Sequence, residues 1–230
     1  MELSPRLSAI AARVPFGSRL ADVGTDHAYL PVSLLLQGTI PWAVASDVNR
    51  GPLDRGRETA RQAGVEDRID FRLCNGLEGL EETSPDVVVL AGMGGELIAR
   101  ILSRAPWTRS RLLLLQPMTA QPELRRWLNG NAYRIEEETL VREGEKIYGV
   151  FTVRGGQDTP YSLGELWAGR QRRGEEAPLR LAFLEDLLRR RRRALSGMER
   201  SARPPKGLED ARRLIAELEQ MKEEWNGWQQ

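Results

Sequence analysis

The sequence contains only one cysteine and one histidine in 230 residues. A single thiol, Cys74, cannot form an internal disulfide, which favours a reducing compartment. One thiol and one imidazole also leave little material for a zinc site, so we expect no metal. No apolar run approaches the roughly 20 residues that span a bilayer, and the first residues lack the basic and then apolar plan of a signal peptide. These absences predict a cytoplasmic protein with neither a membrane segment nor a metal site.

What the sequence does contain is an ordinary globular composition, with 40% hydrophobic and 29% charged residues. Short apolar runs alternate with amphipathic stretches through residues 17–154, which is typical of an α/β protein with a doubly wound sheet. We expect five parallel strands, at residues 20–23, 42–46, 69–73, 87–90 and 112–115. A closing antiparallel hairpin is expected at residues 134–142 and 146–153. The expected helices include residues 4–14, 54–63, 96–103 and 122–128, and one more that follows Gly24.

The composition changes at residues 155–160, where glycines and a proline predict a linker. Beyond it, apolar residues recur at helical spacing in two series: Leu181, Leu184, Leu188, Leu195 and Met198, then Leu208, Ala211, Ile215, Leu218 and Trp225. The prolines between Ala202 and Gly207 must interrupt this helical pattern. We therefore expect two domains, a sheet domain at residues 1–154 and a coiled-coil-like α-helical hairpin at residues 155–230.

Small or polar residues mark four of the predicted strand ends: Asp22 and Gly24, Asp47, Asn75 and Gly76, and Gly92 and Met93. Because the carboxyl ends of parallel strands line one crevice in a doubly wound sheet, we expect these residues to surround a ligand. Asp47 is suited to accept hydrogen bonds from ribose hydroxyls, and the Asn75 amide can pair with an adenine edge. The alternative is that each of these residues only forms a turn.

The turn after the first strand argues against a phosphate-containing ligand. A dinucleotide-binding turn requires Gly-x-Gly-x-x-Gly, whereas Gly24 is followed by Asp26 and Tyr29 at the other glycine positions. A carboxylate repels a pyrophosphate but attracts a sulfonium and an ammonium group. The chain also lacks a P-loop motif. S-adenosyl-L-methionine carries both cations and no phosphate, so Asp26 favours it over NAD.

Together these segments resemble the bacterial TrmK family, the tRNA (adenine-22-N1)-methyltransferases. The resemblance rests on residues 22–31 (Asp-Val-Gly-Thr-Asp-His-Ala-Tyr-Leu-Pro), Asp47 with residues 51–53, residues 75–77, residues 91–95 (Ala-Gly-Met-Gly-Gly) and residues 115–118. It covers residues 1–153, and the helical tail only in type. The sequence departs from the family pattern at Asn75, where an aspartate is usual, and at Gly149, where a glutamate is expected.

The resemblance implies a Rossmann-like class I methyltransferase sheet and methyl transfer from S-adenosyl-L-methionine to N1 of an adenine in tRNA. Position 22 of the tRNA rests on the resemblance alone. The cofactor-binding residues that we expect are Asp22, Gly24, Asp26, His27, Asp47, Val48, Asn75, Gly76, Leu77, Ala91, Gly92 and Met93. Two interpretations stay open for His27. It either has a purely structural role or faces the cofactor or the target base.

Adenine N1 is already a nucleophile when it is unpaired, so placement supplies most of the catalysis. We expect Asp26 to stabilise the developing positive charge or to accept the N6 proton, with Tyr29 as a stacking or hydrogen-bonding partner. The alternative for Asp26 is a cofactor-orienting residue or a helix N-cap. The turn expected at residues 116–118 either meets the substrate base or only ends its strand.

The densest charge run is Arg189, Arg190, Arg191, Arg192 and Arg193. It predicts either a stripe that contacts tRNA phosphates or a solvated face paired with neighbouring carboxylates. The functional alternatives are a methyltransferase that acts on another RNA, a small molecule or a protein, and a non-catalytic RNA-binding protein on a nucleotide-binding fold. We expect a monomer or a weak dimer.

Overall fold

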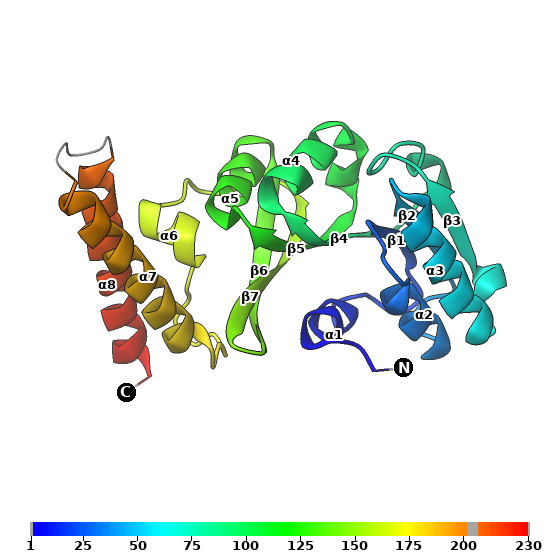
Figure 1. The fold of residues 1–230 in the computed structure, drawn as a ribbon, viewed down its shortest axis with the longest axis horizontal. Helices are drawn as coiled ribbons and strands as arrows, with labels where there is room; N and C mark the ends of the chain where they lie inside the picture. The colour runs from blue at the N-terminus through cyan, green and yellow to red at the C-terminus, as the bar shows by residue number, and fades with distance from the viewer. Residues whose placement is uncertain (1, 202–206, 230) are drawn as a thin grey trace. The chain divides into compact units, whose positions relative to one another are not determined.

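The computed structural model describes residues 2–201 and 207–229. By their internal contacts, the residues divide into two compact units, Met1–Asp158 and Thr159–Gln230 (Figure 1). The first unit holds every strand of the described residues, and the second is helical.

One seven-stranded sheet forms the centre of the first unit, in the order β3-β2-β1-β4-β5-β7-β6. Strands β1 to β5 run parallel, and β7 pairs antiparallel with both β5 and β6, which confirms the predicted parallel sheet and closing hairpin. The strand bounds are β1 (Arg19–Val23), β2 (Trp42–Asp47), β3 (Ile69–Leu73), β4 (Val87–Gly94), β5 (Leu112–Thr119), β6 (Tyr133–Glu143) and β7 (Lys146–Gly155).

Helices cover both faces of this sheet, because right-handed crossovers place the helices before and after the switch point on opposite sides. The helices α1 (Pro5–Ala11), α2 (Tyr29–Leu36) and α3 (Arg50–Gln62) lie on one face, and α4 (Gly95–Ser103) and α5 (Gln121–Gly130) on the other (Figure 1). Short 3-10 helices occupy Glu66–Arg68, Glu81–Thr83 and Pro106–Ser110. The Ser4 hydroxyl caps α1 by accepting from the Leu7 N–H, and the helix ends at Ala11, earlier than the expected residue 14.

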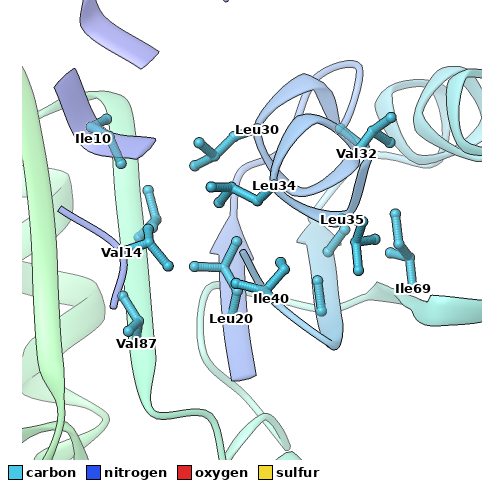
Figure 2. Packing of buried hydrophobic residues seen from close by; sticks show 14 of the residues in the cluster. Ile10, Val14, Leu20, Leu30, Val32, Leu34, Leu35, Ile40, Ile69 and Val87 are labelled. Atoms are coloured by element: carbon cyan, nitrogen blue, oxygen red, sulfur yellow. The ribbon is translucent and has the colours of Figure 1, made fainter. Parts of the chain in front are cut away.

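The core under the first face fixes the elements on either side of the turn after β1. Figure 2 shows Ile10 of α1, Leu30 and Leu34 of α2, and Leu20 of β1 in one buried cluster. None of these four side chains is more than 2% exposed. Burial of each contributes about 1.5–3 kcal/mol relative to exposure. The turn between β1 and α2 is therefore held by two rigidly packed elements.

Two predicted strand ends were wrong, and both concern the centre of the sheet. β4 continues past Leu90 to Gly94, and β5 continues past Leu115 to Thr119, so residues 116–118 are strand and not a turn. Pro117 fits here because it lies opposite Met93, where the β4–β5 register is irregular. The helix expected from residue 54 begins at Arg50, because a first helical turn tolerates glycine and proline.

The second unit contains α6 (Leu163–Ala168), α7 (Arg180–Glu199) and α8 (Leu208–Trp228). Ion pairs show that α7 and α8 are antiparallel, as the predicted hairpin requires: Glu185–Lys222, Arg192–Glu219 and Glu199–Arg212. The expected helix break lies mainly at residues 202–206, which are outside the described residues. None of the described helices combines the length and apolar character that a membrane crossing requires.

The buried face of α7 is rotated from the predicted one. Leu184 and Leu188 are buried as expected, but Leu181 is only half-buried, and Phe183 and Leu187 are buried instead. The difference arises because α6 also packs in this unit, so α7 buries a wider face than a two-helix seam requires.

Candidate active site at the strand ends

The turn after β1 is bonded to β2 and lies against β4. The N–H groups of Gly24 and Thr25 donate to the Ser46 carbonyl at 2.7 Å and 3.0 Å. Gly24 has φ +74°, and a Cβ built on it would lie 2.2 Å from Met93 Cε. A side chain at this position would be both strained and blocked. The structure thus brings together the predicted ends of β1, β2 and β4.

Asp22 is a buried carboxyl near the end of β1, with 8% of its surface exposed. Burial raises the pKa of Asp22 from 3.8 to about 6, and the polar side chain of Thr25 opposes part of this rise. No charged neighbour in the described part of the chain contributes to the shift. An ionised Asp22 is therefore a desolvated anion without a protein cation to balance it.

Asp26 is exposed and forms an ion pair with Arg55 of α3, a partner that the sequence analysis missed. Its second oxygen lies 3.8 Å from His27 Nε2. Asp26 does not cap α2, because the N-cap residue is Ala28 and no side chain caps that helix. The N-cap alternative for Asp26 is therefore wrong, and its carboxylate is available at the surface of the turn.

His27 and Tyr29 form a parallel aromatic pair beside this carboxylate. Their ring centroids lie 5.0 Å apart and their planes differ by 6°. Ala28 between them has φ +54°, a left-handed conformation that costs of order 1 kcal/mol for a non-glycine residue. Tyr29 is 43% exposed, so the stacked pair presents an aromatic surface to solvent.

The ends of β2 and β3 contribute a second group of predicted residues. Asp47 Oδ1 accepts a hydrogen bond of 2.7 Å from the Asn49 N–H, and Val48 is 64% exposed. The Cys74 N–H donates to the Asp47 carbonyl at 3.1 Å, which joins the two strand ends. Asn75 is exposed.

A cavity of about 900 Å³ lies beside Asn75 and Leu77. Its opposite wall includes Leu97 and Ile101 of α4 and Trp107 of the following 3-10 helix. Neither Asp22 nor Gly24 lines this cavity, so it meets the predicted crevice only at the β3 end. Leu77 itself is 4% exposed, which limits it to a wall position.

The ends of β4 and β5 are linked through a side chain. Gly92 has φ +75° and is exposed, and nothing lies within 4 Å of a Cβ built there. Its N–H donates to the Gln116 Oε1 at 3.1 Å. Gln116 is fully buried, so it supports the β4 end from within the sheet and does not itself face a substrate base.

The arginine run of α7 is not a uniform stripe. Arg189 and Arg190 pair with Asp186, and Arg192 pairs with Glu219. Arg191 is half-buried, with its guanidinium carbon 4.3 Å from the centroid of the Trp167 ring, and burial lowers its pKa. Arg191 is therefore less exposed than the other four arginines of the run, because five consecutive residues span more than one helical turn.

Sequence reasoning also missed Arg6 and Glu143, which hydrogen-bond each other beside Gln116. No local pattern announces such contacts between distant segments. Among the described residues, no group of three or more His, Cys, Asp or Glu side chains could hold a metal ion.

A family model described as "Methyltransferase domain" matches residues 3–151. The tRNA (adenine(22)-N(1))-methyltransferase of Bacillus subtilis (strain 168) is 34% identical over 172 residues, which are 74% of this chain and 72% of that protein. A Mycoplasma genitalium protein named "Putative tRNA methyltransferase MG248" is 31% identical over 155 residues, which are 66% of this chain and 69% of that protein.

Solved structures agree over nearly the whole chain. A Streptococcus pneumoniae protein in complex with S-adenosyl-L-methionine has a TM-score of 0.82 and 33% identity, with 94% of this chain and 99% of that chain covered. The B. subtilis m1A22 tRNA methyltransferase TrmK has a TM-score of 0.79 and 26% identity, with 99% and 98% covered. The present chain therefore belongs to the TrmK family of tRNA (adenine(22)-N(1))-methyltransferases.

Proposed function

We propose that this protein transfers the methyl group of S-adenosyl-L-methionine to N1 of adenine 22 in tRNA. The observation that carries the proposal is the contact of Gly24 with Met93 at the end of β1, the strand that holds the buried Asp22, in a chain 34% identical to an enzyme named for this reaction. We place the reaction in the cytoplasm, where tRNA is available.

The residues at the strand ends fit this cofactor. When bound, S-adenosyl-L-methionine supplies an electrophilic methyl group on a sulfonium. A buried Asp22 without a protein cation suits a positively charged ligand. The open space at Gly92 leaves room for the cofactor to lie against the backbone. Asp47 is suited to the ribose hydroxyls, and Asn75 to the adenine edge.

The chain's own contribution to the reaction is placement and charge. The target base must leave its stack or tertiary pair before its N1 is accessible. The exposed Tyr29 ring provides a surface on which such a base can stack. The Asp26 carboxylate lies beside His27, whose ring stacks on Tyr29. For a base stacked on Tyr29, the Asp26 carboxylate can therefore stabilise the positive charge of the methylated ring.

Four arginines of the α7 run are candidates for tRNA contact: Arg189, Arg190, Arg192 and Arg193. Arg192 forms an exposed ion pair with Glu219. Arg189 and Arg190 are exposed beside Asp186, and Arg193 is exposed as well. Exposed ion pairs are weak, about 0–1 kcal/mol, so a phosphate can replace Asp186 as their partner. We assign this contact to Arg189, Arg190, Arg192 and Arg193.

The direct test is incubation of the protein with methyl-labelled cofactor and an unmodified tRNA transcript that carries adenine 22. We expect label in the tRNA, mapped to N1 of that nucleotide, and none in a matched transcript with guanine 22. Label at another nucleotide, or in a protein or small molecule, would support the alternative methyltransferases. Binding of tRNA without any transfer would support a non-catalytic role.

A further inference from the structure

Arg6, in the first turn of α1, connects three elements of the first unit. Its Nε and Nη2 donate to the two carboxylate oxygens of Glu143, at 2.9 Å and 3.0 Å. Its guanidinium carbon lies 5.0 Å from the centroid of the Tyr148 ring. Its remaining terminal nitrogen, Nη1, donates to Gln116 Oε1 at 3.0 Å and to Met118 Sδ at 3.2 Å. One side chain thus joins α1, the β6–β7 hairpin and the end of β5.

The Gln116 amide is fixed by two donors on the same oxygen. Oε1 accepts from Arg6 Nη1 and from the Gly92 N–H at 3.1 Å. A carbonyl oxygen has two lone pairs, and these contacts use both. Because both partners are donors, the amide cannot be rotated by 180° without facing N–H groups toward each of them. Gln116 is also 0% exposed, so its amide is shielded from solvent.

Gly92 needs this partner because it lies in a bulge. Ala91 pairs with Gln116 and Met93 with Pro117, so the register shifts at Gly92. The extra residue of a bulge is left without a ladder hydrogen bond. The Gln116 side chain replaces that bond, and the bulge directs Met93 onto Gly24.

We infer that Arg6 is a positioning residue for methyl transfer, acting through Gln116 to fix the Gly92 bulge and hence Met93 against Gly24. This inference rests on the proposed function for its kinetic consequence. Arg6 is 23% and Glu143 29% exposed in the side chain, so the bidentate pair that aims the guanidinium is partly shielded from water. The hydrogen bonds from Arg6 also hold the pKa of Glu143 below its ordinary value.

Arg13 provides a matched comparison. It follows α1 and donates to Glu137 and Thr139, so it anchors the same segment to the same strand, β6. Within the described part of the chain, none of its hydrogen bonds reaches β5 or Gln116. Removal of either arginine should loosen α1, but only the removal of Arg6 should disturb the β4 bulge.

The test compares Arg6→Ala and Arg13→Ala at a temperature well below both melting transitions. We expect kcat for tRNA methylation to fall about tenfold or more in Arg6→Ala, because small displacements in an aligned site cost up to about 10²-fold. The KM for tRNA should change little, and kcat of Arg13→Ala should stay within about twofold of wild type. Equal kcat losses in the two variants would overturn the inference.

A double-mutant cycle tests the route through Gln116. We expect Arg6→Ala to cause little further loss of kcat in a Gln116→Met background, because the acceptor is already absent. Multiplicative losses would contradict the proposed route.

Amide exchange at Gly92 gives a readout that does not depend on activity. We expect exchange of this N–H to accelerate about tenfold in Arg6→Ala and to be unchanged in Arg13→Ala. Unchanged exchange in Arg6→Ala would overturn the inference even if both enzymes were active. If the wild-type protein left tRNA unlabelled, the proposed function would fail, while the exchange rates would still decide whether Arg6 fixes the bulge.

Discussion

Met93 Cε occupies the space where a side chain on Gly24 would begin, since a Cβ built on Gly24 lies only 2.2 Å from it. This contact joins the turn after β1 to the bulge in β4, the two strands that flank the switch point of the sheet. Ligands of doubly wound sheets bind at that point. We therefore expect a change at either residue to affect the binding of the proposed cofactor.

The first prediction concerns Gly24→Ala. The added methyl group must displace the end of Met93 and must also adopt φ near +74°, which costs about 1–2 kcal/mol. We expect the affinity for S-adenosylhomocysteine, measured by calorimetry, to fall at least about tenfold, which corresponds to ~1.4 kcal/mol. Shortening the obstructing side chain with Met93→Ala should recover part of that loss.

Gly64→Ala is the matched control for this experiment. Gly64 has φ +69°, but nothing lies within 4 Å of a Cβ built there. Its variant should lose similar thermal stability and keep its affinity for the cofactor product. Similar affinity losses in both variants would mean that backbone strain, and not the Met93 contact, controls binding.

The second prediction concerns Asp22→Asn and pH. The pKa of Asp22 is raised in the fold, so the folded state favours the protonated carboxyl, and this advantage is lost as pH rises from about 4 through about 6. The rise in the pKa of Asp22 from 3.8 to about 6 corresponds to about 3 kcal/mol. Without cofactor, Asp22→Asn should therefore melt at a higher temperature than wild type at pH 8 and show no such gain at pH 4.

The affinity for S-adenosyl-L-methionine should depend on pH in the opposite direction to the stability of the fold. The ionised carboxylate suits a cationic ligand, so affinity of the wild type for S-adenosyl-L-methionine should fall as pH drops below about 6. Asp22→Asn should bind weakly at every pH. A pH-independent affinity in the wild type would remove Asp22 from cofactor recognition.

The third prediction separates the two roles left open for Asp26. If its carboxylate stabilises charge during transfer, Asp26→Asn should lower kcat by about 10² to 10³ while product affinity stays within about twofold. If it orients the cofactor, affinity should fall as well. Asp54→Asn on α3 is the control, since that exposed carboxylate also pairs with an arginine, Arg57, and should change neither quantity. A kcat near wild type in Asp26→Asn would exclude an essential role.

The strand segments and the helices could be predicted because their signals are local. Strand residues such as Val87–Leu90 are continuously apolar, and α1 has its cap and proline in adjacent positions. The ends of β1 and β2, beside Gly24 and at Asp47, followed from the same local patterns. Residues 91–94 and 116–119 instead resemble turns, and only their mutual pairing extends the strands.

Other features of the site depend on contacts between distant segments. Arg6 and Gln116 are 110 positions apart, and Asp26 and Arg55 are 29 apart. A lone arginine carries no periodic signal, so its partner is decided by how the packed elements meet. The partial burial of Arg191 has the same cause. Its guanidinium lies over Trp167 of α6, and the sequence of α7 alone does not show which arginine meets that ring.

The last prediction concerns the arginines of α7. If Arg189, Arg190 and Arg193 bind tRNA phosphates, replacing all three with glutamine should flatten the plot of log affinity against log salt by about 0.7–0.9 for each phosphate that is no longer neutralised. The ion pairs of Arg189 and Arg190 with Asp186 are exposed, so stability should barely change. Arg191→Gln should lower the thermal stability and leave the salt slope unchanged, because the Arg191 guanidinium lies over Trp167 and its replacement removes packing. Glutamine at Arg212 and Arg213 of α8 is the control for bulk charge, and an equal change in salt slope there would show that the α7 run has no special role in binding tRNA.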